Sequence, residues 1–237
     1  LGLLVPAYGH VSLIVGEDGA PLSKRHGATS LADLRRQGYL AAAVRNHLFR
    51  LGHSGSEQGF MDLEAMAAAF DTRHLGRSPS RFDQVQLDVW QKGAVHAMPD
   101  ADFGAWAGEA LPATLDPVTR AAFVAAVRPN VVFPADVHAW AKIVFGGLPS
   151  LSEAGEAVVR DAGGRVFDAA AGAAAAGDGD LTAISAAIRD ATGRKGPALF
   201  KPLRLALTGL DHGPVLAPLL RAMPRATVRE RLLRYAH

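Results

Sequence analysis

The sequence predicts a mainly α-helical protein that begins with a short strand-containing segment. Apolar residues recur at helical spacing through most of the chain after residue 30, whereas the only strand-like run is Val11–Val15. Gly and Pro bound the helical segments, and Ser, Thr or Asp stands at several predicted helix starts. The 237 residues are 49% hydrophobic and 20% charged, a composition that argues against intrinsic disorder and can bury a core.

In the first hundred residues, turn and capping signals alternate with apolar periodicity. The predicted strand ends at the Gly16-Glu-Asp-Gly19 turn, and Ser30-Leu-Ala-Asp33 has the pattern of a helix capping box. Asp62 is placed to cap a further helix, and Lys92-Gly93 predicts a break between two short helices. The helices predicted here cover residues 31–38, 40–51 and 63–70, followed by the two short ones within 78–98.

After Pro99, a plausible boundary, the pattern is helical to the end of the chain. Asp116 is a predicted N-cap followed by Pro117 at the first helical position. Pro218 lies inside an apolar segment, where a proline costs a helix hydrogen bond, and Thr227 is predicted to open the last helix. The helices predicted here cover residues 102–111, 116–127, 134–146, 152–162, 165–176 and 181–192, followed by apolar segments at 195–209 and 213–223.

Composition narrows the class of protein. The absence of cysteine excludes a disulfide scaffold, a thiol nucleophile and a cysteine-type zinc site, and the nine histidines are too scattered to suggest a metal site. No segment has the form of a signal peptide or a membrane span, so we expect a cytoplasmic protein, and one that lacks its N-terminus because the sequence starts at Leu1. Of 25 basic residues 20 are Arg, which suits phosphate contacts but also follows from a GC-rich genome.

Residues 22–27, Leu-Ser-Lys-Arg-His-Gly, form a basic loop between the predicted strand and the first capped helix. Ser23, Lys24 and Arg25 supply a hydroxyl and two cations close to Gly27, and these are donors that a phosphate group accepts. Basic loops before helices also occur without any ligand. The loop alone leaves both interpretations open.

A series of motifs runs in a fixed order along nearly the whole chain. Pro6-x-x-x-His10, the turn at 16–19 and the basic loop are followed by Gly38-Tyr39, Asn46 and Leu51-Gly52. The later motifs are Ser80-Arg-Phe-Asp83, Gln86-Leu-Asp-Val-Trp90, Thr192-Gly-Arg-Lys-Gly196, Leu199-Phe-Lys-Pro-Leu-Arg204, Ala206-Leu-Thr-Gly209 and Gly213-Pro214. In order and spacing the series resembles the C-terminal half of bacterial glutamyl-tRNA synthetases.

The resemblance implies the end of a class I catalytic domain with its signature loop (residues 1–29), then a helical stem-contact region (30–99). Two all-helical anticodon-binding subdomains follow, at 100–148 and 149–237. In the family the loop closes over ATP, which is accompanied by Mg²⁺ in the whole enzyme. The lysine that matches Lys24 stabilises phosphate charge as pyrophosphate leaves, and Ser23 and Arg25 would add phosphate contacts. Pro21 departs from the family, which usually has Lys there.

The resemblance also implies that the chain alone is inactive and that its partner is RNA. The family's His-Ile-Gly-His type motif and the nucleotide-binding sheet are absent from this sequence, so we expect no aminoacylation by the isolated chain. The implied partner is tRNA(Glu), with tRNA(Gln) left open, bound by a monomer. The candidate tRNA-binding residues are Arg194, Lys195, Lys201 and Arg204, for which a solvated basic turn is the alternative.

Several other residues are interpreted structurally. Trp90, Trp106 and Trp140 lie in apolar helical patterns, which favours core packing over base stacking, and Asn46 and His47 are expected to be structural. The run Arg225, Arg229, Arg231 and Arg234 is interpreted as a solvated basic helix face. Gln86 and Gln91 stand near positions where the family tends to have Lys and Asn, so no specific contact is predicted from them.

One alternative function belongs to a different class. A non-catalytic, all-helical module that binds RNA or protein would need nothing beyond residues 30–237. Glutaminyl-tRNA synthetases share the signature loop, but their C-terminal β-barrels do not fit the helical pattern after Asp100.

Overall fold

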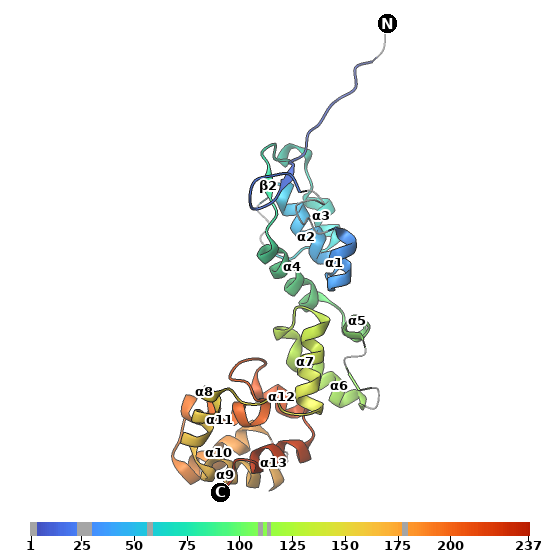
Figure 1. Ribbon diagram of the computed structural model, residues 1–237. Coiled ribbons are helices and arrows are strands. Elements are labelled where there is room, and N and C mark those ends of the chain that lie inside the picture. The colour runs from blue at the N-terminus through green and yellow to red at the C-terminus, as the bar shows by residue number, and fades with distance from the viewer. Residues whose placement is uncertain (1–3, 23–29, 56–58, 109–110, 113–114, 177–179) are drawn as a thin grey trace. The chain divides into compact units, whose positions relative to one another are not determined.

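A computed structural model describes residues 4–22, 30–55, 59–108, 111–112, 115–176 and 180–237. Over these ranges the protein is mainly helical, in agreement with the fold class predicted from the sequence. The chain divides into two compact units, residues 1–99 and 100–237, and Figure 1 colours the chain by residue number through both. We describe each unit by itself.

The first unit is built around two packed helices and a small sheet. α2 packs against α4, and β1 pairs in parallel with β2 so that Ile14 lies opposite Ser80 and Val15 opposite Arg81. The elements are β1 (Ile14–Val15), α1 (Leu31–Gln37), α2 (Ala41–Gly52), α3 (Leu63–Ala69), η2 (Thr72–His74), β2 (Ser80–Arg81) and α4 (Gln84–Ala97).

Local capping explains where these helices start. The Ser30 hydroxyl accepts the Asp33 amide while the Asp33 carboxylate accepts the Ser30 amide, so the predicted capping box is present. The Asp62 carboxylate likewise accepts the Ala65 amide at the start of α3. At the other end of α1, Gly38 has a φ of 94°, the left-handed conformation that ends helices.

Two predictions for the first unit are wrong. The strand predicted over 11–15 is limited to Ile14–Val15, and its partner β2 was not predicted at all because two residues carry no periodicity. The break predicted near Lys92-Gly93 does not exist, since α4 is continuous. A side chain at Gly93 would come within 3.1 Å of the Phe60 ring, so the glycine makes room for that ring within an unbroken helix.

In the residues described, the regular secondary structure of the second unit consists of helices alone. α9 packs against α10 and α13, α8 against α11, α6 against α12, and α5 against α7 (Figure 1). The elements are α5 (Asp100–Ala107), α6 (Pro117–Val127), η4 (Arg128–Asn130), α7 (Pro134–Phe145), α8 (Glu153–Ala162), α9 (Gly164–Ala176), α10 (Leu181–Thr192), α11 (Pro197–Thr208), α12 (Leu216–Ala222) and α13 (Arg225–Leu233). Fully buried residues of its core include Phe103, Phe123, Phe167, Leu203 and Leu219.

Three helix starts of this unit can be compared with the sequence predictions, and α5 starts at Asp100, two residues before its predicted start. Asp116 caps α6 with Pro117 behind it, as predicted. Pro218 lies in the first turn of α12, where its missing N–H removes no helix hydrogen bond. The predicted opening of the last helix at Thr227 is wrong, because α13 starts at Arg225, directly after Pro224. A proline at this position costs no helix hydrogen bond, because the backbone N–H that it lacks would have no partner within the helix.

Candidate functional site

The residues on either side of the basic loop are held by hydrogen bonds. Ser23, Lys24 and Arg25, the candidate phosphate-binding residues, lie outside the described residues. Before the loop, the Gly16 amide donates to the Ala20 carbonyl at 2.9 Å, and Gly19 has a φ of 78°. The Leu22 amide then donates to the Ile14 carbonyl at 3.2 Å, which ties the loop's entry to β1, and the capping box at Ser30 holds its exit.

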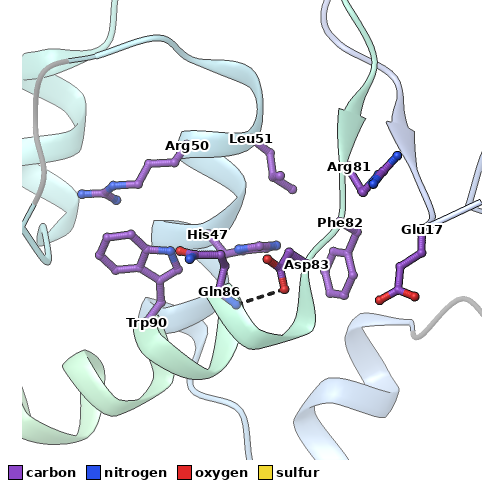
Figure 2. Close-up of a pocket in the computed structure, with 9 residues that line it drawn as sticks. All are labelled: Glu17, His47, Arg50, Leu51, Arg81, Phe82, Asp83, Gln86 and Trp90. Carbon is purple, nitrogen blue, oxygen red and sulfur yellow. Dashed lines mark hydrogen bonds between the residues drawn. The ribbon is translucent and has the colours of Figure 1, made fainter. Parts of the chain in front are cut away.

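Close to this turn, a pocket of about 730 Å³ opens between α2, the β2 segment and the start of α4 (Figure 2). Its lining carries two cations, Arg50 and Arg81, and two anions, Glu17 and Asp83. The Asp83 carboxylate also accepts the Val85 and Gln86 amides and so caps α4. Because the anions balance the cations and the helix start is already capped, the pocket does not favour a phosphate on grounds of charge.

One wall of the pocket is a stack of Arg50 on Trp90. The guanidinium carbon lies 4.0 Å from the indole centroid, a cation–π contact. Arg50 Nη1 donates to Asn46 Oδ1 at 2.9 Å and to the Asn46 carbonyl at 3.1 Å, and Nη2 bonds the Gly59 carbonyl. One face of Trp90 is therefore covered by the protein, although the side chain lines the pocket and is only partly buried.

His47 is a buried histidine at the back of this pocket. It is 3% exposed, and its ring meets the Phe82 ring edge-on with centroids 5.0 Å apart. Its Nε2 has no hydrogen-bond partner in the part of the chain that is described. Burial lowers the pKa of His47, and the charge of Asp83 opposes that shift, so the imidazole is neutral at pH 7.

The side chains of the four candidate tRNA-binding residues differ in exposure and in hydrogen bonding. Arg194 and Lys195 lie in the turn between α10 and α11, where Gly193 and Gly196 have φ values of 71° and 55°. Arg194 donates to the Asp161 carbonyl at 2.7 Å and forms a weak ion pair with the same residue's carboxylate at 3.5 Å. The Lys195 side chain is exposed.

The other two candidates lie on α11. Lys201 is exposed, whereas Arg204 is half-buried, and its Nη1 donates to the Pro214 carbonyl at 2.9 Å. Burial lowers the pKa of Arg204. The structure thus brings Arg194 and Lys195 together in one glycine-bounded turn and leaves both lysines accessible, while Arg204 is engaged with the Gly213-Pro214 loop.

Arg231 was interpreted as part of a solvated basic face, and that interpretation is wrong. It is 2% exposed and donates to three backbone carbonyls, those of Leu207, Ile143 and Gly146. Arg225, Arg229 and Arg234 of the same run are exposed as predicted. An arginine on the buried side of a short helix has no sequence signal, because its acceptors come from distant segments.

Two further polar residues, Gln91 and Asn46, are buried and bond the backbone of the first unit. Gln91 is fully buried; its Oε1 accepts the Leu40 amide and its Nε2 donates to the Gly38 carbonyl. It therefore holds the connection between α1 and α2. Asn46 is also fully buried and bonds both peptide groups of Met61, which supports the structural role expected for it.

In the described part of the chain, no group of three or more His, Asp or Glu side chains is arranged to hold a metal ion. No helix there is long and apolar enough to cross a membrane.

Comparison with known proteins identifies two family models along the chain. Residues 1–89 match the catalytic domain of class I tRNA synthetases (E and Q), and residues 107–236 match the anticodon-binding domain. The catalytic-domain match precedes the anticodon-binding match along the chain.

The similar proteins found by sequence are glutamate–tRNA ligases. The glutamate–tRNA ligase 2 of Alkalilimnicola ehrlichii is 48% identical over 98% of this chain and 49% of its own length. The glutamate–tRNA ligase 2 of Acidithiobacillus ferrooxidans is 47% identical over 93% of this chain and 45% of its own. The chain thus spans about half the length of the curated relatives it matches.

A solved structure agrees on the fold. The crystal structure of a glutamate–tRNA synthetase from Elizabethkingia anophelis superimposes with a TM-score of 0.81 over 99% of this chain and 52% of that one, at 20% identity. Two family models in sequence and relatives at nearly half identity show that this chain belongs to the glutamate–tRNA ligase family of class I aminoacyl-tRNA synthetases.

Proposed function

We propose that this chain is the tRNA-binding portion of a glutamate–tRNA ligase. The observation that carries the proposal is the match of the anticodon-binding domain to residues 107–236, nearly the whole second unit, downstream of a catalytic-domain match. The partner is tRNA(Glu), with tRNA(Gln) as the second substrate to test. In this proposal the protein acts as a monomer in the cytoplasm, where tRNA is charged.

The domain roles follow the order of the motifs. Residues 1–29 end the catalytic domain, residues 30–99 contact the tRNA stem, and residues 100–148 and 149–237 bind the anticodon region. Unstacked anticodon bases are read by side chains on a scaffold that phosphate contacts hold in position. Exposed Lys195 and Lys201, together with Arg194 and Arg204, supply the phosphate contacts in this proposal.

In the whole ligase, ATP and glutamate give glutamyl-adenylate and pyrophosphate, and the glutamyl group then moves to the tRNA 3′ end with release of AMP. Mg²⁺ accompanies ATP and neutralises phosphate charge. Within this chain, Lys24 stabilises the negative charge that develops on the phosphates as pyrophosphate leaves. Ser23 and Arg25 donate hydrogen bonds to the same group.

A salt series tests the tRNA-binding role. Affinity for tRNA(Glu) is measured for the purified chain and for Lys195→Ala and Lys201→Ala, with Lys142→Ala as control. Lys142 is an exposed lysine on α7 outside the candidate set. Lys142→Ala therefore removes the same charge as the two test substitutions. Each lost phosphate contact should lower affinity and flatten the slope of log K against log salt by about 0.7–0.9. Equal effects of all three substitutions would contradict the assignment.

Aminoacylation by the pure chain tests the division of labour. We expect no glutamate-dependent charging of tRNA(Glu), because the nucleotide-binding motif is not in this sequence. Charging that persists after rigorous removal of host synthetases would overturn this part of the proposal.

A further inference from the structure

The one fully buried arginine named above, Arg231, lies where two helices end. α7 ends at Phe145 and α11 ends at Thr208. Arg231 Nη2 donates to the Ile143 and Gly146 carbonyls at 2.5 and 2.9 Å, and Nη1 donates to the Leu207 carbonyl at 2.7 Å. All three acceptors therefore belong to the last turn or the cap of α7 and α11.

This placement suits a guanidinium for two physical reasons. The last carbonyls of a helix have no partner within the helix and carry the negative end of its dipole. A planar guanidinium offers five N–H donors in a fixed fork and stays charged when buried. Arg231 thus satisfies acceptors from two helix ends at once, which a lysine ammonium with three donors on a flexible stem cannot match in the same geometry.

Close packing surrounds these three hydrogen bonds. A side chain on Gly209, the C-cap of α11, would come within 2.8 Å of the Pro149 carbonyl in the connection between α7 and α8. A side chain on Gly213 would come within 2.3 Å of the Trp140 ring of α7. We call this region, the ends of α7 and α11 with Arg231, Pro149 and the 209–213 loop, the α7–α11 joint.

The joint lies between the two proposed anticodon-binding subdomains. α7 is the last helix of residues 100–148, and α11 belongs to residues 149–237. α11 also carries Lys201 and Arg204 and directly follows the turn with Arg194 and Lys195. Any change in the angle between α7 and α11 therefore changes how these side chains stand relative to residues 100–148.

We propose that Arg231 is a positioning residue for tRNA recognition: by tying the ends of α7 and α11 together, it holds the two anticodon-binding subdomains in the relative placement that the tRNA requires. Arg231 itself is too buried to touch RNA. The proposal rests on the tRNA-binding function proposed above.

The chain is well suited to a direct test because it contains no native cysteine. Exposed His138 on α7 and exposed Asp190 on α10 are changed to Cys and labelled with nitroxides. The distance distribution between the labels is then measured by double electron–electron resonance. The three backgrounds are Arg231→Met, Arg231→Lys and Arg234→Met. Arg234 is an exposed residue of the same run, and its partner is Glu230 at 3.1 Å.

The second readout is tRNA(Glu) binding, with the fraction of active protein determined from the stoichiometry. We expect Arg231→Met to broaden the distance distribution and to raise Kd at least about tenfold, which is about 1.4 kcal/mol, at unchanged stoichiometry. Arg231→Lys should fall between this variant and the parent, because it keeps the charge but loses the fork. Arg234→Met should match the parent in both readouts.

Each outcome of these measurements either supports the proposal or overturns it. A role limited to stability would lower the melting temperature or the active fraction but leave both Kd and the distance distribution of the folded molecules unchanged, and that result overturns the proposal. If Arg231→Met does not fold, Arg231→Lys carries the test, and a lysine variant equal to the parent in both readouts overturns it too. A parent chain that fails to bind tRNA(Glu) would refute the proposed function instead, while the distance distributions still test whether Arg231 holds the joint.

Discussion

Replacing Asn46 with alanine removes the side chain that fastens residue 61 to α2. Asn46 is fully buried; its Nδ2 donates to the Met61 carbonyl at 2.8 Å, and its Oδ1 accepts the Met61 amide at 2.9 Å. Met61 is 8% exposed, so water does not readily replace these partners. The same Oδ1 accepts Arg50 Nη1 at 2.9 Å, which links the substitution to the Trp90 stack in Figure 2.

The magnitude follows from the groups left unpaired. Each buried peptide group that loses its partner costs about 1–3 kcal/mol of stability. For the two such groups at Met61 we expect a total loss of about 3 kcal/mol, in the lower part of the summed range. Arg50 loses one acceptor but keeps the Asn46 carbonyl, which Asn46→Ala retains. Since 1.4 kcal/mol is tenfold, slow amide hydrogens of α2 and α4 should exchange about a hundredfold faster.

Native-state hydrogen exchange read by mass spectrometry measures this effect, and amides of α9 and α10 in the second unit serve as an internal control. Gln86→Ala, an exposed change on the same pocket, is the matched control and should have little effect. Acceleration below about fivefold, which is roughly 1 kcal/mol, would refute the reasoning. Equal acceleration in both units would refute the view that the effect is local to the first unit.

Two further predictions concern packing and pH. Gly213→Ala should lower the free energy of unfolding by about 2–4 kcal/mol, because the φ of Gly213 is 120° and the new carbon would overlap the Trp140 ring. Thermal unfolding measures this loss of stability. The control Gly172→Ala, in open space on α9, should instead stabilise the protein by about 1 kcal/mol. The free energy of unfolding of the first unit should fall as pH drops below 6.5, the ordinary pKa of a histidine. Burial lowers the pKa of His47 in the folded state, so the unfolded chain binds the proton at a higher pH than the folded chain does. Urea titrations at several pH values check the sign, His47→Gln should remove this component, and a dependence that survives in that variant would assign it to other groups.

Sequence patterns predicted the fold class and most helix boundaries because those features depend on neighbouring residues. The capping box at Ser30 and the N-cap at Asp116 are local chemistry, and both are present. The unbroken α4 was missed because Gly93 is accommodated by Phe60, a residue more than thirty positions away along the chain. The predicted break was a sound local inference that a tertiary contact overrode.

The candidate site was harder to predict for the same reason. Arg194 and Lys195 were proposed as tRNA contacts because two glycines flank them in sequence, and that role stays a prediction. Arg231 was placed on the surface because nothing near it in sequence reveals that its acceptors lie on α7 and α11. Gln91 is similar, since the Gly38 carbonyl and the Leu40 amide that it bonds are about fifty residues away.

The measurement that tests the central claim most directly compares three RNAs. The purified chain is titrated with tRNA(Glu), with tRNA(Glu) carrying a swapped anticodon, and with an unrelated tRNA, each across a salt series. An anticodon-binding body predicts tighter binding of native tRNA(Glu) than of the swapped form, a difference that persists while overall affinity falls as salt rises. Equal affinity for all three RNAs, lost in parallel with salt, would show only charge-driven binding and would contradict the account.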